Sequence, residues 1–318
     1  MKGKDFLTLA EFTPQDLESV LDVATRLKAR RDAGLGSSAL RGKSVALVFE
    51  KPSLRTRTSF QVAVSELGGF SMNLSANELQ LGRGETVEDT ARVLSRYVHC
   101  IMARVNRHGD LERLAKAARV PVINGLSDLH HPVQILADLL TLRERKGRLR
   151  GLKVGWVGDG DNVCNSWSVG AALTGIHFTA ATPKGYEPAE DVAAMASKMA
   201  RETGGSVTVT ADPFEAVSDA DCVITDTFVS MGFEKEQQQR LKAFMPKYRV
   251  TKALMARAKK DAVFEHCLPA HRGEEMDADV IDGPQSVVFD EAENRLHTEK
   301  ALLCFLMLGK REFSSLMP

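Results

Sequence analysis

One short stretch of the chain combines the residue types that bind a multiply charged anion. "FEKPSLRTRTSF" runs from an apolar segment into Ser53, Arg55 and Thr56. If a helix begins at Ser53, its first backbone N–H groups have no partner, and together with the helix dipole they attract an anion. Arg55 adds a guanidinium fork, and the Ser and Thr hydroxyls can donate as well. The alternative is an ordinary helix start with a capping Ser and a solvated Arg, and this stretch alone does not decide between them.

Three further features favour an anion site. "LGRGETVED" places a flexible basic loop before a helix capped by Thr86 or Glu85, and Arg104 ends the apolar run "CIMAR". In "HHPVQ", His131 and Gln134 are three residues apart at the start of a helix and so share a face. Each feature alone fits a loop charge, a strand-end charge or a helix cap. Their coincidence at strand ends in one half of the chain predicts a phosphate pocket.

Alternating strands and helices must position these groups. Apolar runs at 43–50, 100–105 and 120–126 predict strands buried on both faces, and 131–147 predicts a long helix. The same alternation restarts after about residue 150. It predicts an α/β fold with two doubly wound parallel-sheet domains joined by that helix. We expect a first domain of residues 1–135, completed by a C-terminal helix at about 297–318, and a second domain of residues 136–296. The apolar pattern of the last helix runs from about 296 to 311.

Ligands of open α/β sheets lie at the carboxyl ends of the strands. Most of the unusual polar residues follow apolar runs, which places them at those ends. They occupy residues 52–57, 106–108, 130–134, 158–165, 226–232 and 267–272.

Composition limits the function further. The 318 residues contain 42 Lys and Arg and 42 Asp and Glu, so a general nucleic-acid or acidic-membrane binder is not expected. We expect no membrane span and no signal peptide, because apolar runs are too short and the N-terminal segment lacks an apolar core. The five cysteines are scattered without zinc spacing, which is typical of free thiols in a cytoplasmic protein.

Taken together, the motifs resemble the aspartate/ornithine carbamoyltransferase family. "SLRTRTSF" and "HPVQ" are similar to its carbamoyl phosphate segments. "HCLPAHRGEE" and "DTFVSMG" are similar to the signatures of its ornithine branch, and "GDGDNVCNS" and "FDEAENR" also fit. The resemblance spans nearly the whole chain, in order and with family-like spacing.

The resemblance implies two sets of binding residues. Carbamoyl phosphate would be held by Ser53, Leu54, Arg55, Thr56, Gln80, Arg104, His131, Gln134 and Arg295, with the backbone of Cys267 and Leu268. Ornithine would be held by Asn162, Asp226, Ser230 and Met231. Two positions depart from the family pattern. Leu54 stands where Thr or Met is common, and Phe228 stands where Trp is usual, which could change the packing and closure of its loop.

The implied reaction is direct attack of a neutral amine on carbamoyl phosphate through a tetrahedral intermediate. The catalytic residues would be Arg55, Arg104, His131, Asp226 and Cys267. They neutralise the phosphate, polarise the carbonyl and orient the amine, so no metal or cofactor is expected. The resemblance also implies closure of the "SMG" loop after ornithine enters. It further implies a homotrimer or a multiple of trimers, in which residues 81–85 of a neighbouring subunit help close each site.

Three alternatives remain at this stage. A nicotinamide-dependent oxidoreductase is disfavoured, because "GWVGDGDN" lacks the third Gly of the dinucleotide turn. A non-catalytic paralogue would have lost site residues. A sister transferase acting on acetylornithine or putrescine is disfavoured by "SMG" and "HCLP". The sequence does not distinguish citrulline synthesis for arginine biosynthesis from the reverse, catabolic direction.

Overall fold

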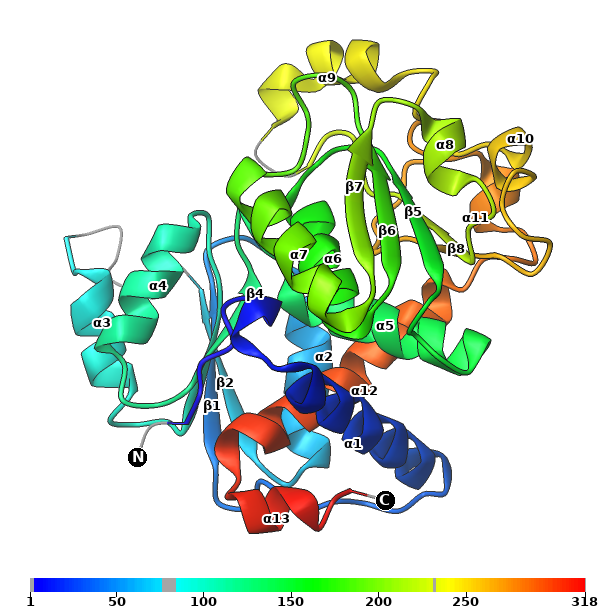
Figure 1. Cartoon of the computed structure of the whole chain (residues 1–318). Helices are drawn as coiled ribbons and strands as arrows, with labels where there is room; N and C mark the ends of the chain where they lie inside the picture. The colour runs from blue at the N-terminus through cyan, green and yellow to red at the C-terminus, as the bar shows by residue number, and fades with distance from the viewer. Residues whose placement is uncertain (1–2, 76–83, 231–232, 318) are drawn as a thin grey trace. The chain divides into compact units, whose positions relative to one another are not determined.

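The computed structural model describes residues 3–75, 84–230 and 233–317. The chain separates into two compact units, Met1–Leu140 with Glu293–Pro318, and Thr141–Ala292 (Figure 1). The chain passes from the first unit to the second within helix α5 (Pro132–Lys146), and it returns within helix α12 (Val288–Met307). Both units carry parallel sheets, which confirms the predicted fold class.

The first unit has a four-stranded parallel sheet in the order β2-β1-β3-β4. Its strands are β1 (Ser44–Phe49), β2 (Phe70–Ser75), β3 (Cys100–Arg104) and β4 (Val122–Leu126). Its other helices are α1 (Pro14–Asp32), α2 (Leu54–Glu66), α3 (Val87–Leu94), α4 (His108–Ala117) and α13 (Lys310–Ser314). The central strands β1 and β3 are apolar because helices cover both faces of such a sheet.

The second unit has a five-stranded parallel sheet in the order β7-β6-β5-β8-β9. Its strands are β5 (Lys153–Val157), β6 (His177–Ala181), β7 (Ser206–Thr210), β8 (Cys222–Ile224) and β9 (Val263–Glu265). Its helices are α6 (Asn162–Thr174), α7 (Glu190–Thr203), α8 (Pro213–Val217), α9 (Gln237–Phe244), α10 (Lys252–Met255) and α11 (Ala278–Ile281). Helices α6 and α7 pack on each other and on β7, and α8 packs on β5 (Figure 1).

Each sheet has one point where the strand order reverses. In the first unit this point lies between β1 and β3, and in the second it lies between β5 and β8. Connections on the two sides of such a point run in opposite directions, which leaves a crevice at the carboxyl ends of the two strands. The segments after β1 and β3, and those after β5 and β8, are therefore where each unit can hold a ligand.

Helix boundaries follow local chemistry. The Thr13 side chain accepts a hydrogen bond from the Asp16 backbone N–H, the Asp16 carboxylate accepts one from the Thr13 backbone N–H, and Pro14 fills the first turn of α1. The prediction for the last long helix was wrong at its start. It begins at Val288 rather than near residue 296, and Asp290 and Glu291 in its first turn complement the helix dipole.

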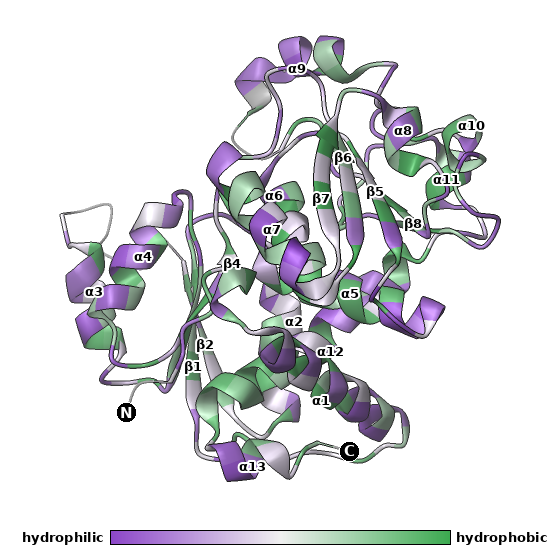
Figure 2. Ribbon diagram, viewed as in Figure 1, coloured by the Kyte–Doolittle hydropathy of each residue, from purple (hydrophilic) through white to green (hydrophobic). Residues whose placement is uncertain are grey.

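The hydropathy of the residues differs between the elements. Hydrophobic residues concentrate on β1 and β5, whereas α1 and α9 carry many hydrophilic residues (Figure 2). Among the described residues, no helix is both long enough and apolar enough to span a membrane.

Candidate functional site

The helix that follows β1 starts without a side-chain cap. Ser53 is the N-cap residue of α2 with extended backbone, and its side chain makes no capping hydrogen bond. The N-cap residues Thr86 of α3 and Asp161 of α6 do accept such bonds. The first turn of α2, whose N–H groups receive no hydrogen bond from the Ser53 side chain, lies at the switch point of the first sheet.

Cationic side chains gather beside this helix start. Arg104 is the last residue of β3 and is buried, and His131, just before α5, is buried as well. Burial lowers the pKa of His131 well below its ordinary value, and the positive charges of Arg295, Arg104 and Arg55 lower it further. Three guanidinium groups that act on one imidazole must converge on it, so this part of the first unit is a concentrated positive site.

Arg295, on α12, joins three helices through hydrogen bonds. Its Nη1 donates to Gln134 Oε1 at 2.6 Å, and its Nη2 donates to Thr56 Oγ1 at 3.2 Å. Gln134 Nε2 in turn donates to Asp138 Oδ1 at 2.8 Å. Three of the residues implied by the family resemblance, Thr56, Gln134 and Arg295, are therefore buried together in one hydrogen-bonded network, and the buried His131 lies within the electrostatic reach of Arg295.

His131 provides a prediction about pH. Because its pKa is lowered in the folded state, the imidazole stays neutral there, while in the unfolded chain it gains a proton below about 6.5. Its contribution to stability is therefore lost as the pH falls below that value. The free energy of unfolding should drop by up to about 2 kcal/mol more between pH 7 and about pH 5 in the native chain than in His131→Gln. Urea unfolding measures this, and parallel curves for the two proteins would contradict it.

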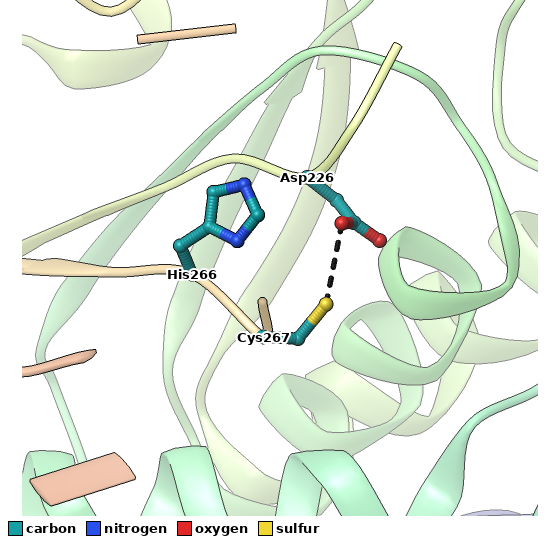
Figure 3. A group of neighbouring side chains, drawn as sticks. All are labelled: Asp226, His266 and Cys267. Carbon is teal, nitrogen blue, oxygen red and sulfur yellow. Dashed lines mark hydrogen bonds between the residues drawn. The ribbon is translucent and has the colours of Figure 1, made fainter. Parts of the chain in front are cut away.

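The second unit brings a thiol and a carboxylate together at the carboxyl ends of β8, which flanks its switch point, and of the adjacent strand β9. Asp226 follows β8, and Cys267 follows the neighbouring strand β9. The Cys267 Sγ–H donates to Asp226 Oδ1 at 3.2 Å, and the two side chains point toward each other (Figure 3). The Thr227 backbone N–H donates to the same oxygen at 2.7 Å, which fixes the orientation of the carboxylate.

Cys267 is held as a neutral thiol. Burial raises its pKa well above the ordinary value, and the negative charges of Asp226 and Glu291 raise it further. A thiolate is the nucleophilic form of cysteine, so this environment is unsuited to covalent attack. The arrangement instead suits a thiol that donates a hydrogen bond and orients a ligand.

Two further carboxyl groups lie beside Asp226. Asp159 and Asp161 follow β5, and each has a raised pKa, caused first by burial and also by the charge of Asp226. For Asp159 the pKa is about 6, held down by the attraction to Arg240. Asp161 Oδ1 caps α6, while Asp161 Oδ2 has no hydrogen-bond partner among the described residues. Three mutually repelling carboxyl groups favour a bound cation.

Arg240 braces this acidic group from the α9 side. It donates to Asp159 and, at 3.2 Å, to the Phe228 carbonyl oxygen, and its guanidinium lies over the rings of Tyr186 and Phe233. Phe228 is fully buried and stacks on Phe244 with ring centroids 4.7 Å apart. The departure from the family pattern at position 228 is thus accommodated inside the core.

The loop of Cys267 is anchored through His266. The Leu268 backbone N–H donates to His266 Nδ1 at 2.9 Å, so that nitrogen carries no proton, and His266 Nε2 pairs with the buried Glu275 at 3.1 Å. These bonds hold Leu268 in a left-handed conformation with φ of 57°.

Two groups of side chains in the described ranges have the composition of a metal site. They are Asp226 with His266 and Cys267, and His271 with Glu274 and Glu275. Both ring nitrogens of His266 are already engaged, which leaves the first group with two ligands, and in the second group the buried Glu275 already binds His266 and the His271 backbone through Oε1. Neither group offers the set of free ligands that a protein metal centre uses.

The remaining residues implied by the resemblance are placed as follows. Asn162 is the first residue of α6, Ser230 is half-buried after β8, and the Leu54 side chain is 74% exposed. Gln80 and Met231 lie outside the described residues, as do 81–83 of the proposed neighbour loop and most of the "SMG" loop.

Sequence reasoning missed Asp159, Asp161, Arg240, Glu275 and Glu299. Asp159 and Asp161 could have been predicted as site residues, because "GDGDN" follows an apolar run at the predicted strand end. The partner of Arg240, Asp159, lies 81 residues away, so nothing in the local pattern marks it, whereas Glu299 follows its partner Arg295 by four residues on one helix face.

The fold and the two half-sites define a two-unit α/β protein that can hold an anion in one unit and a cation in the other. Sequence comparison then specifies the family. Residues 4–144 match the carbamoyl-P binding domain, and residues 150–306 match the Asp/Orn binding domain, of aspartate/ornithine carbamoyltransferase. The chain belongs to the aspartate/ornithine carbamoyltransferase family.

Individual relatives agree with this assignment. An ornithine carbamoyltransferase of Carboxydothermus hydrogenoformans is 52% identical over 306 residues, which cover 96% of this chain and 98% of the relative. The structure of ornithine carbamoyltransferase from Pyrococcus furiosus is 51% identical, with a TM-score of 0.93 over 96% of this chain and 97% of that one. The anabolic ornithine carbamoyltransferase of Campylobacter jejuni is 42% identical, with a TM-score of 0.90 over 95% and 98%.

Proposed function

We propose that the chain transfers the carbamoyl group of carbamoyl phosphate to the side-chain amine of L-ornithine, giving L-citrulline and phosphate. The observation that carries the proposal is the Cys267–Asp226 pair at the carboxyl ends of β8 and β9, among further carboxyl groups. The relatives, which are named ornithine carbamoyltransferases at about half identity over nearly the whole chain, support the same reaction.

The first unit is proposed to bind carbamoyl phosphate. The N-terminal turn of α2, with the hydroxyls of Ser53 and Thr56, surrounds the phosphate, while Arg55 and Arg104 neutralise its charge. Thr56, Arg104 and His131 donate toward the carbonyl oxygen and stabilise the negative charge that develops there. Because His131 is neutral, it can act as a hydrogen-bond donor from one ring nitrogen. Leu54, Gln80, Gln134 and Arg295 complete the ligand set that the first unit is proposed to supply.

The second unit is proposed to bind ornithine. Asp226 pairs with an ammonium group, Asn162 donates to the α-carboxylate, and Ser230 and Met231 complete the site. The side-chain amine loses one proton, its nitrogen bonds to the carbonyl carbon, and the tetrahedral intermediate then expels phosphate and releases the second proton. Phosphate is a good leaving group, so no covalent enzyme intermediate is required, and Cys267 and Asp226 orient the amine and handle protons.

A panel of amines tests the proposal. Purified protein with carbamoyl phosphate should form a ureido product from ornithine at least 10²-fold faster than from acetylornithine, putrescine or aspartate. Acetylornithine lacks the free ammonium and putrescine lacks the carboxylate, so each leaves a buried partner unpaired. Preference for another amine would show a sister transferase. Binding of carbamoyl phosphate without any product would show a non-catalytic paralogue.

Separate observations support proposals for the oligomeric state, the direction of the reaction and the cellular compartment. We propose a homotrimer or a multiple of it, supported by the exposure of Leu54, Phe70 and Tyr97 in the first unit, and sedimentation of the same preparation tests this. A Pyrococcus furiosus relative, 51% identical, is named anabolic, which supports the direction of arginine biosynthesis. All five cysteines are described and none forms a disulfide, in keeping with the cytoplasm.

A further inference from the structure

The first unit contains a fully buried carboxyl group, that of Glu299, which the proposed reaction does not use. Glu299 lies one helical turn after Arg295 on α12, and its side chain is inaccessible to solvent. Glu299 Oε1 accepts from Arg295 Nη2 at 2.9 Å and from Arg295 Nε at 3.2 Å. Glu299 Oε2 has no hydrogen-bond partner among the described residues. Burying a carboxyl group costs free energy when one of its oxygens lacks a hydrogen bond, so a buried Glu at this position needs a structural or functional explanation.

The guanidinium nitrogens of Arg295 donate both to Glu299 and to the residues of the anion site. Nε and Nη2 are held by Glu299, while Nη1 reaches Gln134 and Nη2 also reaches Thr56. Thr56 lies in the first turn of the uncapped helix α2, and Gln134 lies in the first turn of α5. Without Glu299, the guanidinium would lose two of its four hydrogen bonds, and its rotamer would no longer be fixed.

We propose that Glu299 is a positioning residue of the anion site, which fixes Arg295 against Thr56 and Gln134 and whose charge tunes how strongly the site attracts a phosphate group. This proposal rests on the assignment of the first unit as the carbamoyl phosphate site. It differs from the ligand role of Arg295, because Glu299 acts only through that residue.

Glu299 can change its charge near neutral pH. Burial raises its pKa to about 7, against the opposing attraction of Arg295 and the Ser59 hydroxyl. Below that pH the carboxyl is mostly neutral and the charge of Arg295 is uncompensated, while above it the carboxylate cancels that charge. The other ionisable groups around this network include Asp138 on α5, which is reached through Gln134, and His131, which stays neutral beside Arg55 and Arg104. Lys300 on α12 pairs with Glu66 of α2 at 2.8 Å.

Glu299→Gln separates charge from shape, because the amide keeps an acceptor for Arg295 and mimics the neutral carboxyl. At about pH 8.5 it should bind inorganic phosphate, and carbamoyl phosphate as judged by KM, on the order of fivefold more tightly than the native chain. At about pH 6 the two proteins should bind alike. The titration of phosphate itself cancels in the ratio of variant to native protein. Saturated kcat should be little changed, because the effect is on binding.

Glu299→Leu removes both the charge and the acceptor. We expect phosphate to bind more weakly to it than to Glu299→Gln at both pH values, because Arg295 is no longer fixed. Glu293→Gln serves as the matched control. It removes a carboxylate from the same helix at a position where the side chain is 46% exposed and faces His297, and it should follow the native curve.

Calorimetry with inorganic phosphate provides a readout that needs no turnover. A pH-independent ratio between Glu299→Gln and the native chain, in protein that unfolds cooperatively, would overturn the proposal even if citrulline is formed. The expected ratio without any ureido product would leave the proposal standing and overturn the proposed function. Failure of the native chain to bind either phosphate or carbamoyl phosphate would overturn both.

Discussion

Asp226→Asn is expected to lower kcat/KM for ornithine by about 10³-fold while KM for carbamoyl phosphate stays within about twofold. The Asp226 carboxylate accepts the Cys267 thiol hydrogen and the Thr227 backbone N–H through one oxygen. Asn keeps the shape and one acceptor, but it removes the charge that pairs with an ammonium group. Steady-state kinetics with each substrate varied in turn measures the two effects separately.

The expected loss in Asp226→Asn is confined to ornithine, and a control variant tests whether it comes from this site. Asp219→Asn removes a carboxylate from the same unit at a position where the side chain is 63% exposed, and it should leave both constants unchanged. Equal losses for ornithine and carbamoyl phosphate in Asp226→Asn would point to misfolding. Unchanged kinetics would remove Asp226 from the amine site.

Arg295→Met is expected to raise KM for carbamoyl phosphate by about 10²-fold or more, because charge-assisted hydrogen bonds to a buried anion are lost. It should also destabilise the fold by about 3 kcal/mol at pH 8, since it leaves Glu299 buried without its cation. The sign of the pH dependence follows from the raised pKa of Glu299, about 7 in the native chain. A raised carboxyl pKa means that stability falls as the pH rises from about 4.5 through the folded value.

The double variant Arg295→Met with Glu299→Gln isolates the loss of stability that comes from leaving the Glu299 carboxylate buried without its cation. It should recover much of the lost stability at pH 8 but none of the affinity for carbamoyl phosphate. Urea unfolding at pH 6 and pH 8 gives the comparison, with the exposed Arg311→Met as the control for removal of an Arg. If the double variant is as unstable as Arg295→Met, Arg295 stabilises the fold through packing rather than through its pairing with Glu299.

The sequence predicted the parallel sheets because their strands are buried on both faces and are therefore nearly continuous in apolar residues. β1 and β3 are of this kind, and Ser53 and Arg104 could be placed at their carboxyl ends from the chain alone. β2 was missed, because "FSMNLS" lies at the edge of the sheet and is only partly buried, so polar residues are tolerated there.

The supporting residues of the site were less predictable for a different reason. The contact from Arg295 to Thr56 joins positions 239 residues apart, and that from Arg240 to Asp159 joins positions 81 apart. Such pairs depend on how whole elements pack, and local periodicity carries no record of them. Glu299 pairs within its own helix with Arg295, but it lies on a buried face, where a carboxyl group is not expected from composition.

The order of elements along the chain has a consequence for how the protein becomes active during synthesis. Arg295 and Glu299 belong to the first unit but follow the whole of the second unit in the chain. A ribosome that has translated every strand of both sheets has therefore not yet supplied the residues that lock Thr56 and Gln134 together. Because domains tend to fold as they emerge, the second unit can be complete while the first still waits for α12. Capture of phosphate by the nascent chain would thus be one of the last steps of its maturation.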